Sequence, residues 1–516
     1  YIINGSDTDV DPETGLGFIV DPGTIPLVSG RDPSASIDFS KIEDTYQDAG
    51  LDFKLPLFFG GREILLKAGY AYTDNERDSL NRQYFYTGFS TIANQCNDTR
   101  LNGGDAAQRI DRLLDDAFLS SGACGSTPPI RIDQTPNNTD FPGETLGTLQ
   151  VHAGYFGLDA QVNDFVRTAL GVRFEDGEQT SETIFFDSVS DSRVVFSAPV
   201  IEEEYFLPAA TVTWNFADNL QLRVGYSETI TRPQFREKSP NIFLNTETER
   251  SFVGNPFLEN AEIKNYDARL EWYFGREEFI TLGAFYKDLE NPIEEIGRSV
   301  ANESDVTTFI NTPQAELYGA EFEFEKRFEL YDFAQRFAEG SALSEWTSSK
   351  DLYFAVNYTY TSSEVQAGSE PVNLAAPLAT GLGFVPLEIS AENLIQDGRA
   401  LQGQSDHLLN IQFGYEDLDV NSKATLLLNY ASERIREAGT LLVGADTPDV
   451  IEEPPLTLDF VYTRGFEVWG GEYEVGFKAQ NILGEEYKAF SEGRGEVPVE
   501  EYDLGQTFAI SLKRKF

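Results

Sequence analysis

Several kinds of residue or segment are scarce in this 516-residue chain, and each absence excludes a class of protein. No run of about eighteen consecutive apolar residues occurs, so a helical membrane protein is excluded. Only two histidines are present, His152 and His407, which leaves little for histidine-based metal or triad chemistry. The neighbouring Ser405 and Asp406 do not change this, because consecutive residues of a strand point to opposite faces. We therefore expect no enzyme, no catalytic residue, no cofactor and no metal ligand.

Basic residues are few relative to acidic ones: 39 lysines and arginines stand against 86 aspartates and glutamates, and the formal net charge is -47. This charge excludes nucleic acid as a partner, because phosphate binding needs a basic surface. The acid excess is typical of solvated loops and strand extensions. A second interpretation is cation capture, since the run from Asp7 to Glu13 alternates carboxylates as calcium ligands do, but it lacks the glycine and the later glutamate of an EF-hand loop.

Only two cysteines occur, Cys96 and Cys124, and both lie in the polar segment 91–143, which we interpret as a long extracellular loop. Two thiols close together in an otherwise cysteine-free chain favour a disulfide in an oxidising compartment. A pair of free thiols is the alternative.

The stretch 219–292 contains three segments in which apolar and polar residues alternate, as in half-buried strands. Residues 275–277 form a minimal turn between two of them, whereas 230–260 is a long polar connection. Short turns at one end, long loops at the other and aromatic residues near strand ends favour an outer-membrane barrel. A soluble β-sandwich fits these three strands equally well. Their apolar positions are Leu220, Leu222, Val224 and Tyr226, then Tyr266, Ala268, Leu270, Trp272 and Phe274, then Ile280, Leu282, Ala284 and Tyr286.

The same alternation continues along the chain without a break in composition, and it predicts about fifteen strands. Short turns and long loops alternate along the whole chain, which a sandwich or a propeller would not require. The sequence therefore predicts an all-β protein, a large antiparallel transmembrane β-barrel. Short turns are expected at 56–62, 163–164, 217–218, 275–277, 416–419 and 470–471, and outer loops at 91–143, 181–199, 230–260 and 370–403.

Seven stretches, spread in family order, resemble the C-terminal β-barrel portion of TonB-dependent outer-membrane receptors. The terminal Phe516 resembles the outer-membrane assembly signal of such barrels. The stretches are GYSETITRP (225–233), GNPFLENAEIKNYDARLEWYF (254–274), FYKDLENPIE (285–294), AELYGAEFEFEK (315–326), LQGQSDHLLN (401–410), KAQNILGEEY (478–487) and GQTFAISLKRKF (505–516).

The resemblance implies active import across the outer membrane of a Gram-negative bacterium. In this family, the TonB energy-coupling complex pulls on an N-terminal plug domain and so opens a path for a captured substrate. We find no plug in the sequence, and family barrels have about twenty-two strands, so a plug and about seven strands are expected outside residues 1–516. The expected partners are the TonB complex through that plug, outer-membrane lipid and lipopolysaccharide, the barrel-assembly machinery and a small-molecule substrate.

The expected cargo is a siderophore, a vitamin or an oligosaccharide, bound by the lumen and by the predicted loops 91–143, 230–260 and 370–403. A passive porin-like channel is the alternative, and an outer-membrane hydrolase is a third interpretation. For five motif residues we expect a structural role at the base of a loop rather than contact with substrate: Arg232, Pro233, Gly254, Asn255 and Pro256.

Overall fold

The computed structural model of the chain describes residues 36–87, 131–134, 144–187, 192–245, 250–300, 303–338, 340–377, 383–441, 447–491 and 495–515. Its main element is one antiparallel sheet of 17 strands, of which β3 and β6 are short. The predicted count of about fifteen long strands is thereby confirmed. The strands are β1 (Ser36–Phe59), β2 (Arg62–Thr87), β3 (Arg131–Gln134), β4 (Glu144–Asn163), β5 (Val166–Asp187), β6 (Ser192–Ser197), β7 (Ile201–Ala217), β8 (Leu220–Thr231), β11 (Ala261–Gly275), β12 (Glu278–Glu290), β15 (Gln314–Glu329), β16 (Lys350–Gln366), β19 (His407–Asp417), β20 (Ser422–Ala431), β23 (Thr457–Val468), β24 (Gly471–Gln480) and β27 (Thr507–Lys515).

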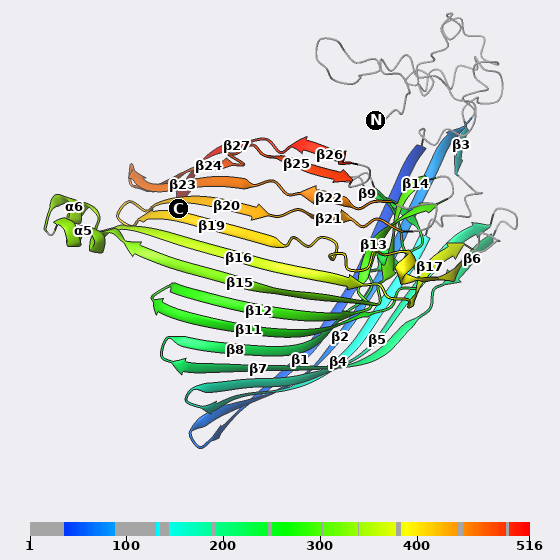
Figure 1. The fold of residues 1–516 in the computed structure, drawn as a ribbon, viewed down its shortest axis with the longest axis horizontal. Coiled ribbons are helices and arrows are strands. Elements are labelled where there is room, and N and C mark those ends of the chain that lie inside the picture. The colour runs from blue at the N-terminus through cyan, green and yellow to red at the C-terminus, as the bar shows by residue number, and fades with distance from the viewer. Residues whose placement is uncertain are drawn as a thin grey trace, which may run out of the picture.

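Each long strand pairs with the next long strand along the chain, from β1 to β27. Figure 1 shows that the sheet is strongly curved, so that β1, β2, β4 and β5 cross behind the later strands. Among the described residues, β1 pairs only with β2, and β27 only with β24. The wall is therefore a curved, large part of a barrel, and the described strands do not close on themselves.

The register gives the wall one apolar face and one polar face. Residues that pair across neighbouring strands share a face, so each row of partners can be followed around the sheet. One row is apolar or aromatic in every strand from β7 to β20, and the next row is polar in every strand from β7 to β23. The apolar row is Trp214, Leu222, Leu270, Leu282, Phe322, Tyr358, Leu409 and Tyr430, and the polar row is Asn215, Gln221, Glu271, Thr281, Glu323, Asn357, Asn410, Asn429 and Thr457.

These two rows identify the outer and the inner face of the barrel wall. Apolar side chains of the first face are exposed, for example Leu282 at 51%, whereas Glu271 and Thr281 of the second are buried at 3% and 2%. An apolar, exposed face suits lipid, and a polar face suits a water-filled lumen. The alternating pattern read from the sequence is thus confirmed as the division between lipid and lumen.

The connections at one end of the barrel fold into small sheets and a hairpin of their own, to the right in Figure 1, and we call these elements together the cap. A cluster of buried apolar side chains lies among these connections, including Ile310, Val365 and Ile395 at 0% exposure. The elements are the sheet of β9 (Ile242–Asn245), β10 (Arg250–Val253), β13 (Ile293–Val300) and β14 (Glu303–Asn311), the hairpin of β17 (Pro371–Pro377) and β18 (Phe384–Ser390), the 3-10 helix η1 (Ala391–Asn393), and the sheet of β21 (Arg434–Glu437), β22 (Val450–Glu453), β25 (Glu486–Ser491) and β26 (Val497–Asp503).

The opposite end carries short turns with one exception. Between β15 and β16 the chain forms two helices, α5 (Leu330–Ala338) and α6 (Ala342–Trp346), which project beyond the strand ends in Figure 1. None of the helices in the described parts of the chain has the length and apolar character needed to cross a membrane. The short turns are Gly60-Gly61, Asp164-Phe165, Asp218-Asn219, Arg276-Glu277, Leu418–Asn421 and Trp469-Gly470.

Two boundaries expected from the sequence are wrong. The turn predicted at 56–62 is confined to Gly60-Gly61, and Pro56 lies inside β1. Proline is tolerated there because β1 has no second neighbour among the described residues, so its missing N–H breaks no ladder. The outer loop predicted at 181–199 is largely strand: β5 continues to Asp187, and β6 pairs back on it.

Candidate functional site

The connection between β8 and β11 folds inward and packs against the inner face of the wall. It begins with α4 (Phe235–Lys238), whose Phe235 is 8% exposed. A Cβ at Gly147 of β4 would collide with the Phe235 ring, and the guanidinium of Arg77 in β2 lies 5.8 Å from the ring centroid. Gly147 lies on the face opposite Phe156, which is exposed on the outer face. The loop therefore occupies part of the lumen mouth.

Arg232 and Pro233 attach the start of this loop to β5. Arg232 Nη2 lies 2.9 Å from Glu175 Oε2, and Arg173 Nε lies 2.6 Å from the other oxygen of the same carboxylate. Four residues after Glu175 on the same strand, Gln179 Nε2 donates to Pro233 O at 2.8 Å. Two arginines thus share one carboxylate whose side chain is only 10% exposed, which fixes the position where the chain leaves β8.

Lys238 is fully buried under the loop, with 0% exposure. Its Nζ donates to Pro256 O at 3.2 Å and to Leu258 O at 3.1 Å. Burial lowers the pKa of Lys238 to about 8, because the charged amine has lost most of its water and has only carbonyl oxygens as hydrogen-bond partners. Burial also raises the pKa of the adjacent Glu237, whose Oε2 accepts from Gln234 N at 2.8 Å at the start of α4.

Gly254 and Asn255 lie against α4 on the other side of the loop. Gly254 N donates to Ser239 O at 2.8 Å. A Cβ on Gly254 would lie 2.6 Å from Arg236 O and 2.7 Å from Glu237 O, and would also meet Ser239 O. Only glycine leaves room for three carbonyl oxygens at this distance from the backbone.

Asn255 joins this loop to two other loops. Its Nδ2 donates to Phe309 O of β14 at 3.0 Å and to Asn373 O of β17 at 2.7 Å. Its Oδ1 accepts from Phe257 N at 3.1 Å. The residue has 0% exposure, and both amide hydrogens and the carbonyl oxygen are engaged. A single side chain therefore holds three connections together.

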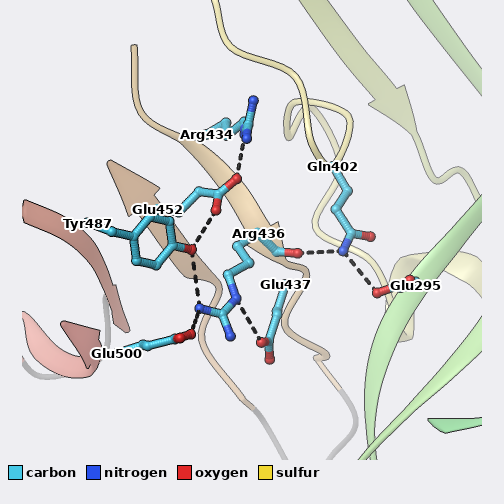
Figure 2. A network of polar contacts seen from close by, with 8 residues as sticks. All are labelled: Glu295, Gln402, Arg434, Arg436, Glu437, Glu452, Tyr487 and Glu500. Atoms are coloured by element: carbon cyan, nitrogen blue, oxygen red, sulfur yellow. Dashed lines mark hydrogen bonds and ion pairs between the residues drawn. The ribbon is translucent and has the colours of Figure 1, made fainter. Parts of the chain in front are cut away.

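A second polar network holds the sheet of β21, β22, β25 and β26, as Figure 2 shows. Arg436 Nη1 donates to Tyr487 Oη at 3.3 Å and pairs with Glu500. Tyr487 in turn donates to Glu452 Oε2 at 2.6 Å. Burial and the Glu452 carboxylate raise the pKa of Tyr487 to about 12, so the phenol stays protonated and remains a donor.

Gln402 connects that sheet to β13, and Arg399 of the same loop also binds β13. Gln402 Nε2 donates to Arg436 O at 2.6 Å and to Glu295 Oε2 at 3.2 Å (Figure 2). Nearby, Arg399 Nη2 lies 2.6 Å from Glu294 Oε2, with both side chains 4% exposed. Burial raises the pKa of Glu294, and the arginine opposes this rise. The loops after β12, β16 and β20 are thus joined by buried charges and amides.

A cavity of about 370 Å³ adjoins Arg399 between these loops. Polar and apolar residues line it together: Gln396, Gly439, Thr440, Leu441, Thr447, Pro448 and Asp449. In the described ranges, no group of three or more histidine, cysteine, aspartate or glutamate side chains is placed to hold a metal ion.

A known protein family matches this chain in sequence. The sequence model of the family described as "TonB dependent receptor-like, beta-barrel" matches residues 3–486. The chain belongs to this family. Among curated proteins, none matches it significantly.

Solved TonB-dependent receptors share the fold at low sequence identity. The unliganded ferric citrate transporter FecA superposes with a TM-score of 0.53 at 13% identity, over 95% of this chain and 56% of that one. The ferric-catecholate import receptor Fiu from E. coli K12 gives 0.53 at 11%, over 92% and 55%. The siderophore receptor PiuA from Acinetobacter baumannii gives 0.52 at 12%, over 92% and 56%. The chain therefore spans little more than half the length of these receptors.

The motif residues expected from the sequence are all brought to the inward loop. Pro233, Gly254, Asn255 and Pro256 are buried, and Arg232 is partly buried against β5. The predicted loops 230–260 and 370–403 meet through Asn255 and Asn373. Outside the described residues lie the predicted disulfide of Cys96 and Cys124, the acidic run 7–13, the terminal Phe516 and all of the loop 91–143 except 131–134.

Other residues of the site are not predicted from the sequence. Lys238 and Glu294 belong to polar segments that look solvated in the sequence, and no local pattern marks them as buried. Phe235, three residues after Arg232, is the one available signal, because an aromatic residue flanked by charges in a polar loop needs a place to pack. His407 Nδ1 lies 2.9 Å from Tyr358 Oη, whereas Ser405 Oγ donates to Ser432 O at 2.8 Å.

Proposed function

We propose that the chain forms the barrel of an outer-membrane receptor that binds a scarce substrate and imports it with energy from the TonB complex. The substrate is a siderophore, a vitamin or an oligosaccharide. In the whole receptor, a plug domain links the barrel to the TonB complex, and the barrel-assembly machinery inserts the wall among outer-membrane lipid and lipopolysaccharide.

The observation that carries the proposal is the position of the β8–β11 loop. A passive channel needs an open lumen, whereas here the inward loop packs onto the inner wall through Arg232 and Phe235. The polar inner row provides hydrogen-bonding groups around the inner face of the wall. Family membership supports the same reading.

Substrate contact is proposed for exposed residues of the cap, and loop support for the buried ones. Gln234, Arg236 and Glu259 are exposed on the inward loop. The motif residues Gly254, Asn255 and Pro256 are buried, so their proposed role is to shape the base of the loop. The loops 91–143 and 370–403 complete the proposed binding surface.

Uptake by whole cells tests this proposal. Cells that express the full-length receptor would be given radiolabelled ferric siderophores, cobalamin and oligosaccharides one at a time, with and without a functional TonB complex. We expect saturable uptake of one substrate class that disappears without TonB. Uptake that rises linearly with concentration and does not need TonB would instead support the porin-like channel, and the proposal would be abandoned.

A further inference from the structure

The two helices between β15 and β16 carry large exposed aromatic side chains. Phe333 of α5 is 63% exposed, and Trp346 of α6 is 61% exposed. Among the described side chains, Gln335 Nε2 of α5 donates to Ser344 Oγ of α6 at 3.3 Å, and Ser344 is 1% exposed. Exposed aromatic groups on two neighbouring helices next to a lipid-facing wall indicate a surface that contacts an apolar environment.

Apolar side chains of the outer face lie close to both ends of the helical segment. Phe328 and Leu352 pair across β15 and β16 and share the face of Phe322 and Tyr358 in the apolar row. Phe328 lies two residues before α5 and is 45% exposed. The strand ends that carry the helices therefore present apolar side chains on the lipid-facing side.

Trp346 is fixed on that same side. Lys350 occupies the outer face at the first position of β16, and its Nζ lies 4.6 Å from the centroid of the Trp346 ring. Lys350 Nζ also donates to Trp346 O at 2.7 Å and lies 3.0 Å from Asp417 Oδ2. The Trp346 ring thus covers a buried Lys350–Asp417 ion pair at a strand end, and tryptophan at strand or helix ends is the residue that membrane interfaces favour at headgroup level.

The neighbouring turns extend this exposed apolar rim. Leu418, in the turn between β19 and β20, is 65% exposed, and its backbone N donates to Ser349 O at 2.8 Å, next to Lys350. Trp469, in the turn between β23 and β24, is 98% exposed. The helices are thus continuous with a row of apolar groups along the short-turn edge of the barrel.

We propose that α5 and α6 form an interfacial anchor that lies in the headgroup region of the leaflet on the short-turn side, with Phe333 and Trp346 inserted among phospholipid acyl chains. Such an anchor holds this edge of the wall at a defined depth in the bilayer. The inference rests on the membrane barrel and is independent of the proposed cargo.

Tryptophan quenching tests the anchor in the full-length receptor reconstituted in phosphatidylethanolamine–phosphatidylglycerol vesicles. A chain with Trp214→Phe, Trp272→Phe and Trp469→Phe leaves Trp346 as the tryptophan of this barrel. We expect lipids brominated near the headgroup to quench Trp346 several-fold more strongly than iodide present on both sides of the membrane. A chain that keeps Trp272 instead provides the lipid-facing control, and Val385→Trp in β18, with the other four replaced by Phe, provides the aqueous control.

Preferential quenching by iodide would overturn the proposal, because the aromatic surface would then face water or await a protein partner. Photo-cross-linking gives a second test that changes one residue only. A benzoylphenylalanine placed at Phe333 is expected to form a phospholipid adduct detected by mass, whereas the same group at Val385 is expected to form none. Absence of the lipid adduct at Phe333 in an assembled receptor would also overturn the proposal.

Discussion

Arg399 and Glu294 form a buried ion pair, in which Nη2 lies 2.6 Å from Oε2 and both side chains are 4% exposed. The Nε and Nη1 atoms of the same guanidinium are buried and have no hydrogen-bond partner among the described residues. The Glu294 carboxylate, which comes from a different loop, therefore offsets most of the free-energy cost of burying the Arg399 charge.

Removing one partner of this pair is expected to destabilise the cap by about 3–5 kcal/mol, because the other charge is left buried alone. Glu294→Ala and Arg399→Met should each make the loops sensitive to protease in native membranes. The double variant Arg399→Met/Glu294→Leu should recover much of the resistance, since no charge is then buried. A double variant as sensitive as the sum of the two single variants would contradict this account.

Lys238 is expected to make the inward loop more stable at high pH. Its folded pKa of about 8 lies below the ordinary 10.5, so the open loop binds more protons between these values. Raising the pH through this window therefore disfavours opening, by a total on the order of 3 kcal/mol. Hydrogen exchange of residues 254–260, corrected for the intrinsic rate at each pH, should slow accordingly, and Lys238→Met should lose this component. Equal pH dependence in both proteins would show that Lys238 does not titrate as described.

Gly254→Ala is expected to expel the inward loop without preventing assembly of the wall. The new Cβ would meet three backbone carbonyl oxygens, including Arg236 O at 2.6 Å and Glu237 O at 2.7 Å, and backbone cannot move aside cheaply. Gly157→Ala in β4 is the matched control, because its Cβ would lie 3.5 Å from the nearest atom. Heat-modifiable mobility should remain normal in both, while only Gly254→Ala should lose substrate binding. Wild-type binding by Gly254→Ala would argue against a role for the loop.

Adjacent residues of β8 should respond in opposite ways to a charge. Leu222 lies in the apolar outer row and Gln221 in the polar inner row. Leu222→Arg should reduce assembly in the outer membrane, because a lipid-facing arginine near the midplane costs about 2–4 kcal/mol. Gln221→Arg places the same charge in the lumen and should assemble normally. Equal levels of both variants in purified outer membranes would contradict the assignment of Leu222 to the outer face and Gln221 to the inner face.

Cys96 and Cys124 are expected to form a disulfide within the loop 91–143, as their isolation in the sequence predicts. Peptide mapping without reductant should yield one cross-linked fragment that separates on reduction. Recovery of both cysteines as alkylated peptides before reduction would establish free thiols instead.

The wall was predictable because its signal is local. Alternation in β8, β11 and β12 needs only neighbouring residues, and lipid imposes it along nearly the whole strand. The prediction failed at the end of β5, where Ser181 and Thr183 are buried at 2% and 1% although both are polar. Both lie on the inner face, and the outer-face residues Glu178, Thr180 and Glu182 are polar as well, so the apolar alternation is missing there.

The cap was not predictable because its contacts join distant polar segments. The bond from Asn255 to Asn373 spans 118 residues, and neither residue carries a local sign of burial. In β14, Val306, Phe309 and Ile310 are buried at 1%, 2% and 0%, on both faces of the strand, which removes the alternation that reveals a half-buried strand. Such packing depends on partners that a single sequence does not identify.

The position of Asn255 also limits how such a receptor could be redesigned. One amide group serves β14 and β17 as well as its own loop, so these three connections share a single junction. A graft of one loop from a relative with different cargo would leave two backbone carbonyls without their donor. Retargeting this barrel would therefore require the three connections to be transplanted together, as one cassette.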